Sequence, residues 1–138
     1  MKSMWRLTGL VLIGAAVFLA GCGGKYADVK KVNAEFVSML EDYVAELEKA
    51  DSAKDVAAAM NSYADQLEGI MPEMKKLQEK YPELKDQDNI PAELEESMES
   101  AMAAGMKMAG TFMKIAPYME DPEVQKAQER IGRIMMQE

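Results

Sequence analysis

Residues 27–50 read ADVKKVNAEFVSMLEDYVAELEKA, and the spacing of their apolar side chains decides the fold class. Apolar residues, with one asparagine among them, recur at steps of three and four: Val29, Val32, Asn33, Phe36, Leu40, Tyr43, Val44 and Leu47. Charged residues occupy the opposite side: Lys31, Glu35, Asp42, Glu46 and Lys49. This periodicity predicts an amphipathic helix of about seven turns, whose apolar side must pack against another element.

A second amphipathic helix is expected after residue 52. Ser52 followed three residues later by Asp55 is typical of a helix N-cap. The apolar side of this helix consists of Val56, Met60, Tyr63, Leu67, Ile70, Met71, Met74, Leu77 and Tyr81. Pro72 removes one backbone hydrogen bond, so we expect either a kink near Glu68–Pro72 or two separate helices.

A third long helix and a short fourth one follow a polar loop at residues 85–89. Pro91 is expected to open the third helix, over about residues 91–117. Its apolar side consists of Leu94, Met98, Ala101, Gly105, Met108, Phe112, Ile115 and Met119. Asp121, Pro122 and Glu123 are typical of the first positions of the fourth helix. That helix carries Val124, Ala127, Ile131, Ile134 and Met135 on its apolar side.

The sequence therefore predicts an all-α protein with one domain over residues 27–138. No β-branched run alternates with the period of two that a strand requires. Four amphipathic helices with short connections favour an antiparallel helical bundle of three long helices plus a short fourth. A three-helix bundle with the short helix packed across one end is the alternative.

The N-terminus has the pattern of an export signal. Lys2 and Arg6 supply positive charge, an uncharged and mostly apolar stretch covers residues 7–20, and small residues follow. The apolar run of about 14 residues is shorter than the roughly 20 that a membrane-spanning helix needs. Residues 1–21 are therefore expected to be a removable signal peptide and not a membrane anchor.

Residues 19–22, Leu19-Ala20-Gly21-Cys22, resemble the lipobox of bacterial lipoproteins. This resemblance covers residues 1–22 and implies cleavage before Cys22, whose thiol then carries a lipid such as palmitate. An ordinary secretory signal with an incidental cysteine is the alternative. Cys22 is the only cysteine, so an intramolecular disulfide is impossible. The remainder of the chain resembles other small helical lipoproteins, a likeness that implies no particular activity.

The resemblance also implies a location in the bacterial cell envelope. Two or more acyl chains attach a protein stably to a membrane. An aspartate directly after the cysteine favours retention of a lipoprotein in the inner membrane, but here Gly23 and Gly24 follow Cys22. In a Gram-negative cell we therefore expect the protein on the periplasmic face of the outer membrane. Residues 22–26 form a tether of at most about 18 Å. Partners of the domain are therefore expected close to the membrane.

Composition excludes several classes of function. The net charge is −8, and the signal peptide contains only basic charges, so the mature domain is more acidic still. Such a surface opposes binding to nucleic acid. The chain has no histidine, and after acylation it has no thiol, which excludes catalytic triads, the usual zinc sites and covalent haem attachment. We expect a non-enzyme without a cofactor, and a solvated acidic cluster at Glu93, Glu95, Glu96 and Glu99.

The third helix is unusually rich in methionine. Its methionines are Met98, Met102, Met106, Met108, Met113 and Met119. Thioethers hold Cu(I), so Met102, Met106 and Met113 are candidate copper ligands. Adaptable core packing is the alternative, and it fits Met98, Met108 and Met119 best. A third interpretation is an exposed flank that binds a partner or an apolar ligand.

Small residues cluster in the same helix at Ala101, Ala103, Ala104, Gly105, Ala109 and Gly110. Close packing inside the bundle explains them, and so does an exposed face for self-association. The leading hypothesis is a membrane-tethered helical module that binds another envelope protein or a copy of itself. The alternative is a periplasmic carrier of Cu(I) or of a small molecule, with methionine-lined walls.

Overall fold

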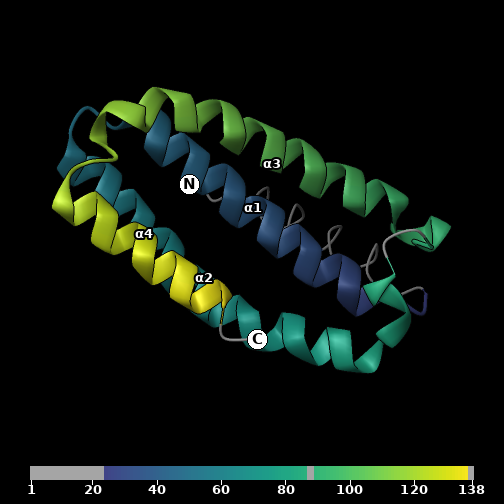
Figure 1. Cartoon of the computed structure of the whole chain (residues 1–138). Helices are drawn as coiled ribbons and strands as arrows, with labels where there is room; N and C mark the ends of the chain where they lie inside the picture. Colours follow the sequence, from purple (N-terminus) through teal and green to yellow (C-terminus); the bar gives the residue numbers. More distant parts are fainter. Residues whose placement is uncertain (1–23, 87–88, 137–138) are drawn as a thin grey trace, which may run out of the picture.

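The computed structural model describes residues 24–86 and 89–136, and this part of the chain is helical without any strand (Figure 1). Its α-helices are α1 Ala27–Lys49, α2 Ala53–Lys80, α3 Glu95–Ile115 and α4 Pro122–Met135. Short 3₁₀ turns lie between them: η1 Pro82–Lys85, η2 Ala92–Leu94 and η3 Ala116–Tyr118. The all-helical class predicted from the sequence is confirmed, and four helices pack against one another.

Two helix starts have the caps that the sequence predicts. The Oγ of Ser52 accepts a hydrogen bond from the backbone nitrogen of Asp55 at 3.2 Å, and it donates one to the Asp55 carboxylate at 2.8 Å. At α4, the carboxylate of Asp121 accepts from the backbone nitrogen of Glu123 at 2.8 Å, and Pro122 is the first helical residue. Both caps satisfy backbone donors that have no partner within the helix.

Pro72 does not divide α2, which is a single helix of 28 residues. The alternative of two separate helices is therefore excluded, and the expected kink stays a prediction. Pro72 lies on the exposed side, and the carbonyl that it leaves without an intrahelical donor belongs to Glu68, which is also exposed. Water can satisfy that carbonyl, so the interruption is tolerated.

The third helix begins later than expected, at Glu95 and not at Pro91. The backbone of Pro91 is extended, with ψ of 136°, and one 3₁₀ turn separates it from α3. At the other end, a second 3₁₀ turn that includes Pro117 closes the helix after Ile115. The expected range of 91–117 therefore joined α3 with the whole of η2 and part of η3.

Figure 1 shows α3 lying along α1, and α4 lying along the first half of α2. Contacts between α1 and α3 keep an almost constant sequence separation, 64 residues between Asn33 and Ser97 and 66 between Glu48 and Lys114. The two helices therefore run in the same direction. On the other side, Arg130 of α4 bridges Asp65 at 2.6 Å and Glu68 at 3.1 Å.

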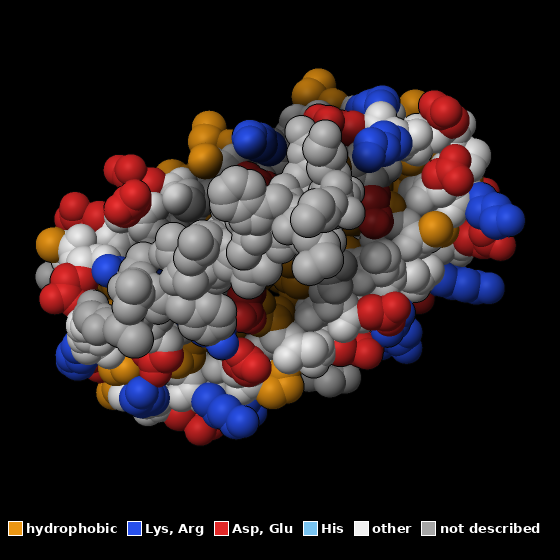
Figure 2. All heavy atoms as spheres, turned by 180° about the vertical axis from the view of Figure 1, so that it is seen from behind, with side chains coloured by type: hydrophobic (Ala, Val, Ile, Leu, Met, Phe, Trp, Pro, Cys, Tyr) orange, Lys and Arg blue, Asp and Glu red, His pale blue; other side chains and the backbone are white. Residues whose placement is uncertain are grey.

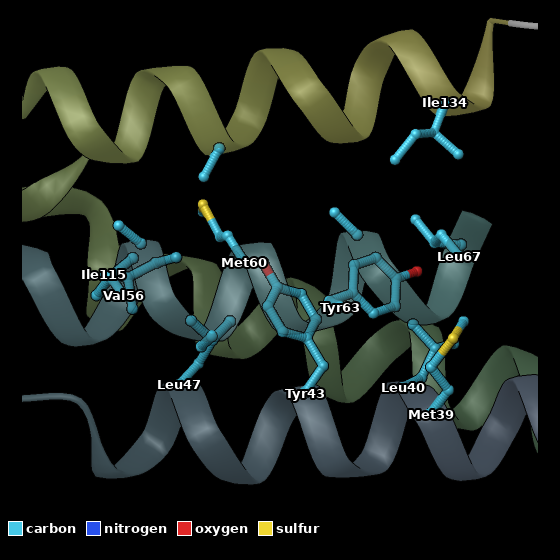
Figure 3. Packing of buried hydrophobic residues seen from close by; sticks show 14 of the residues in the cluster. Met39, Leu40, Tyr43, Leu47, Val56, Met60, Tyr63, Leu67, Ile115 and Ile134 are labelled. Carbon is cyan, nitrogen blue, oxygen red and sulfur yellow. The ribbon is translucent and has the colours of Figure 1, made fainter. Parts of the chain in front are cut away.

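The core lies where α1 and α2 meet, and side chains along α3 and α4 complete it (Figure 3). Tyr43 and Tyr63 stack at its centre, with ring centroids 4.4 Å apart. The largest fully buried side chains surround them: Leu47, Met60, Leu67, Ile115, Val56 and Val124. Burial of each large aliphatic side chain contributes about 1.5–3 kcal/mol to stability. No helix in the described part of the chain combines the length and apolar character that crossing a bilayer requires.

Candidate functional site

Four methionines of α3 present their side chains to solvent: Met98 is 42% exposed, Met102 69%, Met106 72% and Met113 82%. We call them the methionine face. The spacing places all four within roughly a quarter turn of the helix circumference. Large apolar side chains are normally drawn into the core, so such a group on one helix is a candidate binding surface.

Packing on α1 explains why this side of α3 is free. The buried residues of α3 are Ala104, Thr111 and Ile115, which lie on the opposite side of the helix. The Nδ2 of Asn33 in α1 donates to both the backbone oxygen and the Oγ of Ser97, each at 2.6 Å. These contacts fix the rotation of α3 about its own axis and turn the methionines outward.

The predicted apolar side of α3 is thus partly wrong. Met98 was expected in the core and is exposed, whereas Met108 and Met119 are half-buried against the core as expected. The pattern failed because the packed side uses small or polar residues. Thr111 is buried in this contact. Its burial is tolerated because its hydroxyl donates to the backbone oxygen of Lys107 at 3.1 Å, so no buried polar group is left unpaired.

The stretch from Ser100 to Met113 contains a single charged residue, Lys107. By contrast, Figure 2 shows acidic and basic side chains interspersed over the visible rim of the molecule, with apolar side chains in separate patches between them. Exposed Ala103, Ala109 and Gly110 lie beside the methionines and leave the backbone of α3 accessible. The surface of α3 is therefore apolar and adaptable over about four turns.

Close packing inside the bundle does not explain the glycines of α3. A Cβ added at Gly105 or at Gly110 meets no atom within 4 Å. Each glycine nevertheless costs about 1 kcal/mol of helix stability relative to alanine. The explanation that the sequence left open, an exposed face for association, is the one that remains for Gly110.

The three candidate copper ligands lie on this surface but do not form a compact set. Met102 and Met106 are one turn apart, whereas Met113 is about 10 Å further along the axis. A single ion cannot bind all three thioethers. Among the described residues, no three histidine, cysteine, aspartate or glutamate side chains cluster in a way that could hold a metal ion.

Two hollows among the described residues lie between α1 and α2, and no residue of α3 lines them. One has a volume of about 140 Å³ and is lined mainly by apolar side chains where α4 no longer covers α2, including Val29, Phe36, Met74 and Leu77. The other, about 250 Å³, is lined by Glu35, Met39, Gln66, Gly69, Ile70 and Glu73. Ligand pockets usually enclose about 300–1,000 Å³. Both hollows are below that range.

A cluster that the sequence reasoning missed joins the start of α1 to the end of α2. We call it the tyrosine clasp: Lys25, Tyr26, Asp28, Lys80, Tyr81 and Glu83. The Oη of Tyr81 donates to the backbone oxygen of Lys25 at 2.7 Å and to Asp28 at 2.9 Å, and its ring lies 5.2 Å from that of Tyr26. The Tyr81-Pro82 pair was the only signal of this cluster in the sequence. It does not reveal that Asp28, 53 residues earlier, is the partner of Tyr81.

Two ion pairs flank the clasp. Lys80 lies 2.6 Å from Asp28, and its hydrogen bond holds the pKa of that carboxyl below the ordinary 3.8. Lys25 lies 2.6 Å from Glu83, and the bond between them lowers the pKa of Glu83 and raises that of Lys25. These shifts come from ion pairing at the surface and not from a buried catalytic pair. The acidic cluster Glu93, Glu95, Glu96 and Glu99 is exposed, as expected.

Cys22 and the expected signal peptide lie outside the described residues, so both the signal peptide and the lipid anchor stay predictions from the sequence. No family model matches the chain, and neither a curated protein nor a solved structure matches it.

Proposed function

We propose that the protein is a lipoprotein of the bacterial cell envelope, anchored through Cys22, whose helical domain binds another protein through the methionine face. The exposure of Met102, Met106 and Met113, in a stretch of α3 with one charged residue, carries this proposal. Methionine side chains are flexible and polarizable, and they adapt to an apolar partner surface. The function is non-enzymatic, and it involves neither a cofactor nor nucleic acid.

The clasp supports the anchored arrangement. α1 begins at Ala27, only five residues after Cys22, and the clasp bonds Lys25 and Asp28 to the end of α2. A domain attached in this way stays within about 18 Å of the membrane surface. We propose the periplasmic side of the outer membrane as its location in a Gram-negative cell.

We further propose that the four helices form an antiparallel bundle of two stacked hairpins. The three-residue turn between α1 and α2, and the pairing of Asp28 with Lys80 and of Tyr43 with Tyr63, support the first hairpin. α3 and α4 form a wider second one. This framework keeps the methionine face on an outer helix.

Two experiments in the producing cell test the proposal. A palmitate analogue should label the natural chain but not a Cys22→Ala variant, and equal labelling would contradict the anchor. A photo-crosslinking amino acid at position 106 should give a discrete protein adduct, whereas the same group at Glu129, an exposed position of α4, should give none. Equal adducts at both positions, or none at 106, would contradict the binding role.

A copper carrier is the second candidate function, because Met102 and Met106 are exposed one turn apart. Two thioethers from one chain leave a Cu(I) ion incompletely coordinated, so this candidate requires further ligands from elsewhere. Titration of the full chain in detergent with Cu(I) and a competing chelator tests it. Submicromolar affinity that Met102→Leu/Met106→Leu abolishes would favour copper, and weaker affinity that the variant leaves unchanged would exclude it.

A further inference from the structure

Charge is distributed unevenly along α3. Its first turns carry Glu95, Glu96 and Glu99, whereas its only basic residues are Lys107 and Lys114, in the second half. Glu99 and Lys114 border the methionine face on the same side of the helix, about four turns apart. One edge of the apolar surface is therefore acidic at its start and basic at its end.

We infer that the partner at the methionine face is a second copy of this chain, with the two α3 helices antiparallel about a two-fold axis near Met106. This inference rests on the proposed binding role and names its partner. In such a pair, the edge of the methionine face that carries Glu99 and Lys114 lies against the same edge of the second copy. The two helices run in opposite directions along this contact. Glu99 of each copy then lies beside Lys114 of the other.

Charge complementarity distinguishes this partner from others. An antiparallel pair places Glu99 beside Lys114 at both ends of the contact, whereas a parallel pair leaves these opposite charges about four turns apart. Lys107 is 4.0 Å from Glu41 and largely exposed, and Lys114 donates to a single backbone oxygen, that of Glu48. An ammonium group has three donors, so Lys114 can accept a second partner without losing the first.

The small residues fit the same geometry. With the axis near Met106, Met102 of one copy lies at the same level along the helix as Gly110 of the other. Among the described residues, nothing beyond the adjoining backbone of α3 comes within 4 Å of a Cβ at Gly110, so a second copy can approach there. The small residue at this position allows the two helix axes to approach to about 8 Å.

The symmetry is compatible with two lipid anchors in one membrane. Each copy carries its N-terminal end beside the start of α1, and α1 runs along α3 in the same direction. When the two-fold axis is normal to the membrane, the two N-terminal ends lie at the same height at opposite ends of the dimer. The helices then lie parallel to the membrane surface.

The test uses the full lipidated chain in phosphatidylcholine vesicles, prepared from equal amounts of ¹⁵N-labelled and unlabelled protein. A carbodiimide joins carboxylates to amines in direct contact. We expect a cross-linked peptide pair that joins Glu99 to Lys114 and carries one label. Within one α3 these residues are about 22 Å apart, so the mixed product identifies contact between copies.

Two matched variants complete the test. Gly110→Leu should reduce the mixed product at least tenfold, whereas Gly69→Leu, at an exposed glycine of α2 with equally open space, should leave it unchanged. Helical circular dichroism and the melting temperature should not fall in either variant, because neither side chain meets an obstacle. Equal yields in both variants, or no mixed product between Glu99 and Lys114, would overturn the dimer.

The outcome also separates this inference from the binding role. If the photo-crosslinker at position 106 captures a different protein in cells and the vesicles give no mixed product, the dimer is wrong and the binding role stands. If position 106 gives no adduct of any kind, both are wrong.

Discussion

The amide of Asn33 in α1 donates two hydrogen bonds to Ser97 in α3, one to its backbone oxygen and one to its hydroxyl oxygen, both at 2.6 Å. This contact between residues 64 apart in sequence sets the rotation of α3. It explains why an asparagine interrupts the apolar side of α1. It also determines that the methionines of α3, on the other side of the helix from Ser97, face outward.

Replacement Asn33→Ala should lower the free energy of unfolding by about 1 kcal/mol or more, because it removes both hydrogen bonds between α1 and half-buried Ser97. Urea unfolding followed by circular dichroism measures this loss. Hydrogen exchange should accelerate most in α3. Asn61→Ala is the matched control, since the Asn61 amide bonds only to Ala57 within its own helix and should cost less. Equal losses would show that Asn33 does not hold α3.

The stacked pair Tyr43 and Tyr63 predicts instability at alkaline pH. Burial raises the pKa of Tyr63 to about 12 and raises that of Tyr43 from its ordinary 10.0. A phenol whose pKa is raised by folding contributes stability that is present below pH 10 and is lost as the pH rises through its folded value. Stability should therefore fall above pH 10. Replacement Tyr43→Phe should reduce this decline, measured by urea unfolding between pH 8 and 11, and an unchanged slope would contradict it.

The clasp predicts a second decline at acid pH. Lys80 holds the pKa of Asp28 below 3.8, so the contribution of this carboxylate is present above that value and is lost as the pH falls through the folded pKa. The ion pair is largely exposed and screened by solvent, so its contribution is small. Asp28→Asn should be less stable than the natural chain at pH 7 and equally stable near pH 2. If Asp28→Asn is still less stable than the natural chain at pH 2, the loss of stability does not come from the charge of Asp28.

Gly110 allows a test of whether the single folded chain needs a glycine at this position. Because an added Cβ meets nothing, Gly110→Ala should raise the free energy of unfolding by about 0.5–1 kcal/mol through helix propensity alone. Chemical denaturation at low protein concentration, where association is negligible, measures this gain. A loss of stability would mean that Gly110 is required inside the bundle.

Much of this fold could be predicted from residue patterns. The steps of three and four in α1 and α2, and the caps at Ser52 and Asp121, are local signals that the structure confirms. The rotation of α3 could not be predicted, because it depends on a long-range polar contact and on buried Ala104 and Thr111, which hydrophobicity alone does not mark. For the same reason the sequence placed Met98 in the core.

The candidate site was predictable only in part. An exposed methionine flank was one of three interpretations, and the choice among them required knowing which side of α3 packs on α1. The tyrosine clasp was not predicted, since it joins residues from opposite ends of a helical hairpin through side-chain bonds. Cys22 could be assigned a chemistry from its sequence context alone, and that assignment stays a prediction.

Methionine oxidation in intact cells tests the central claim most directly, because the chain supplies its own control. Met106 and Met113 are 72% and 82% exposed, and Met136, at the end of α4, is 85% exposed. Thioethers oxidise to sulfoxides according to their accessibility. In a brief peroxide pulse followed by mass spectrometry, Met106 and Met113 should be oxidised several-fold more slowly than Met136 in cells, and at similar rates in the diluted, purified chain. Similar rates in both settings would show that the methionine face has no partner.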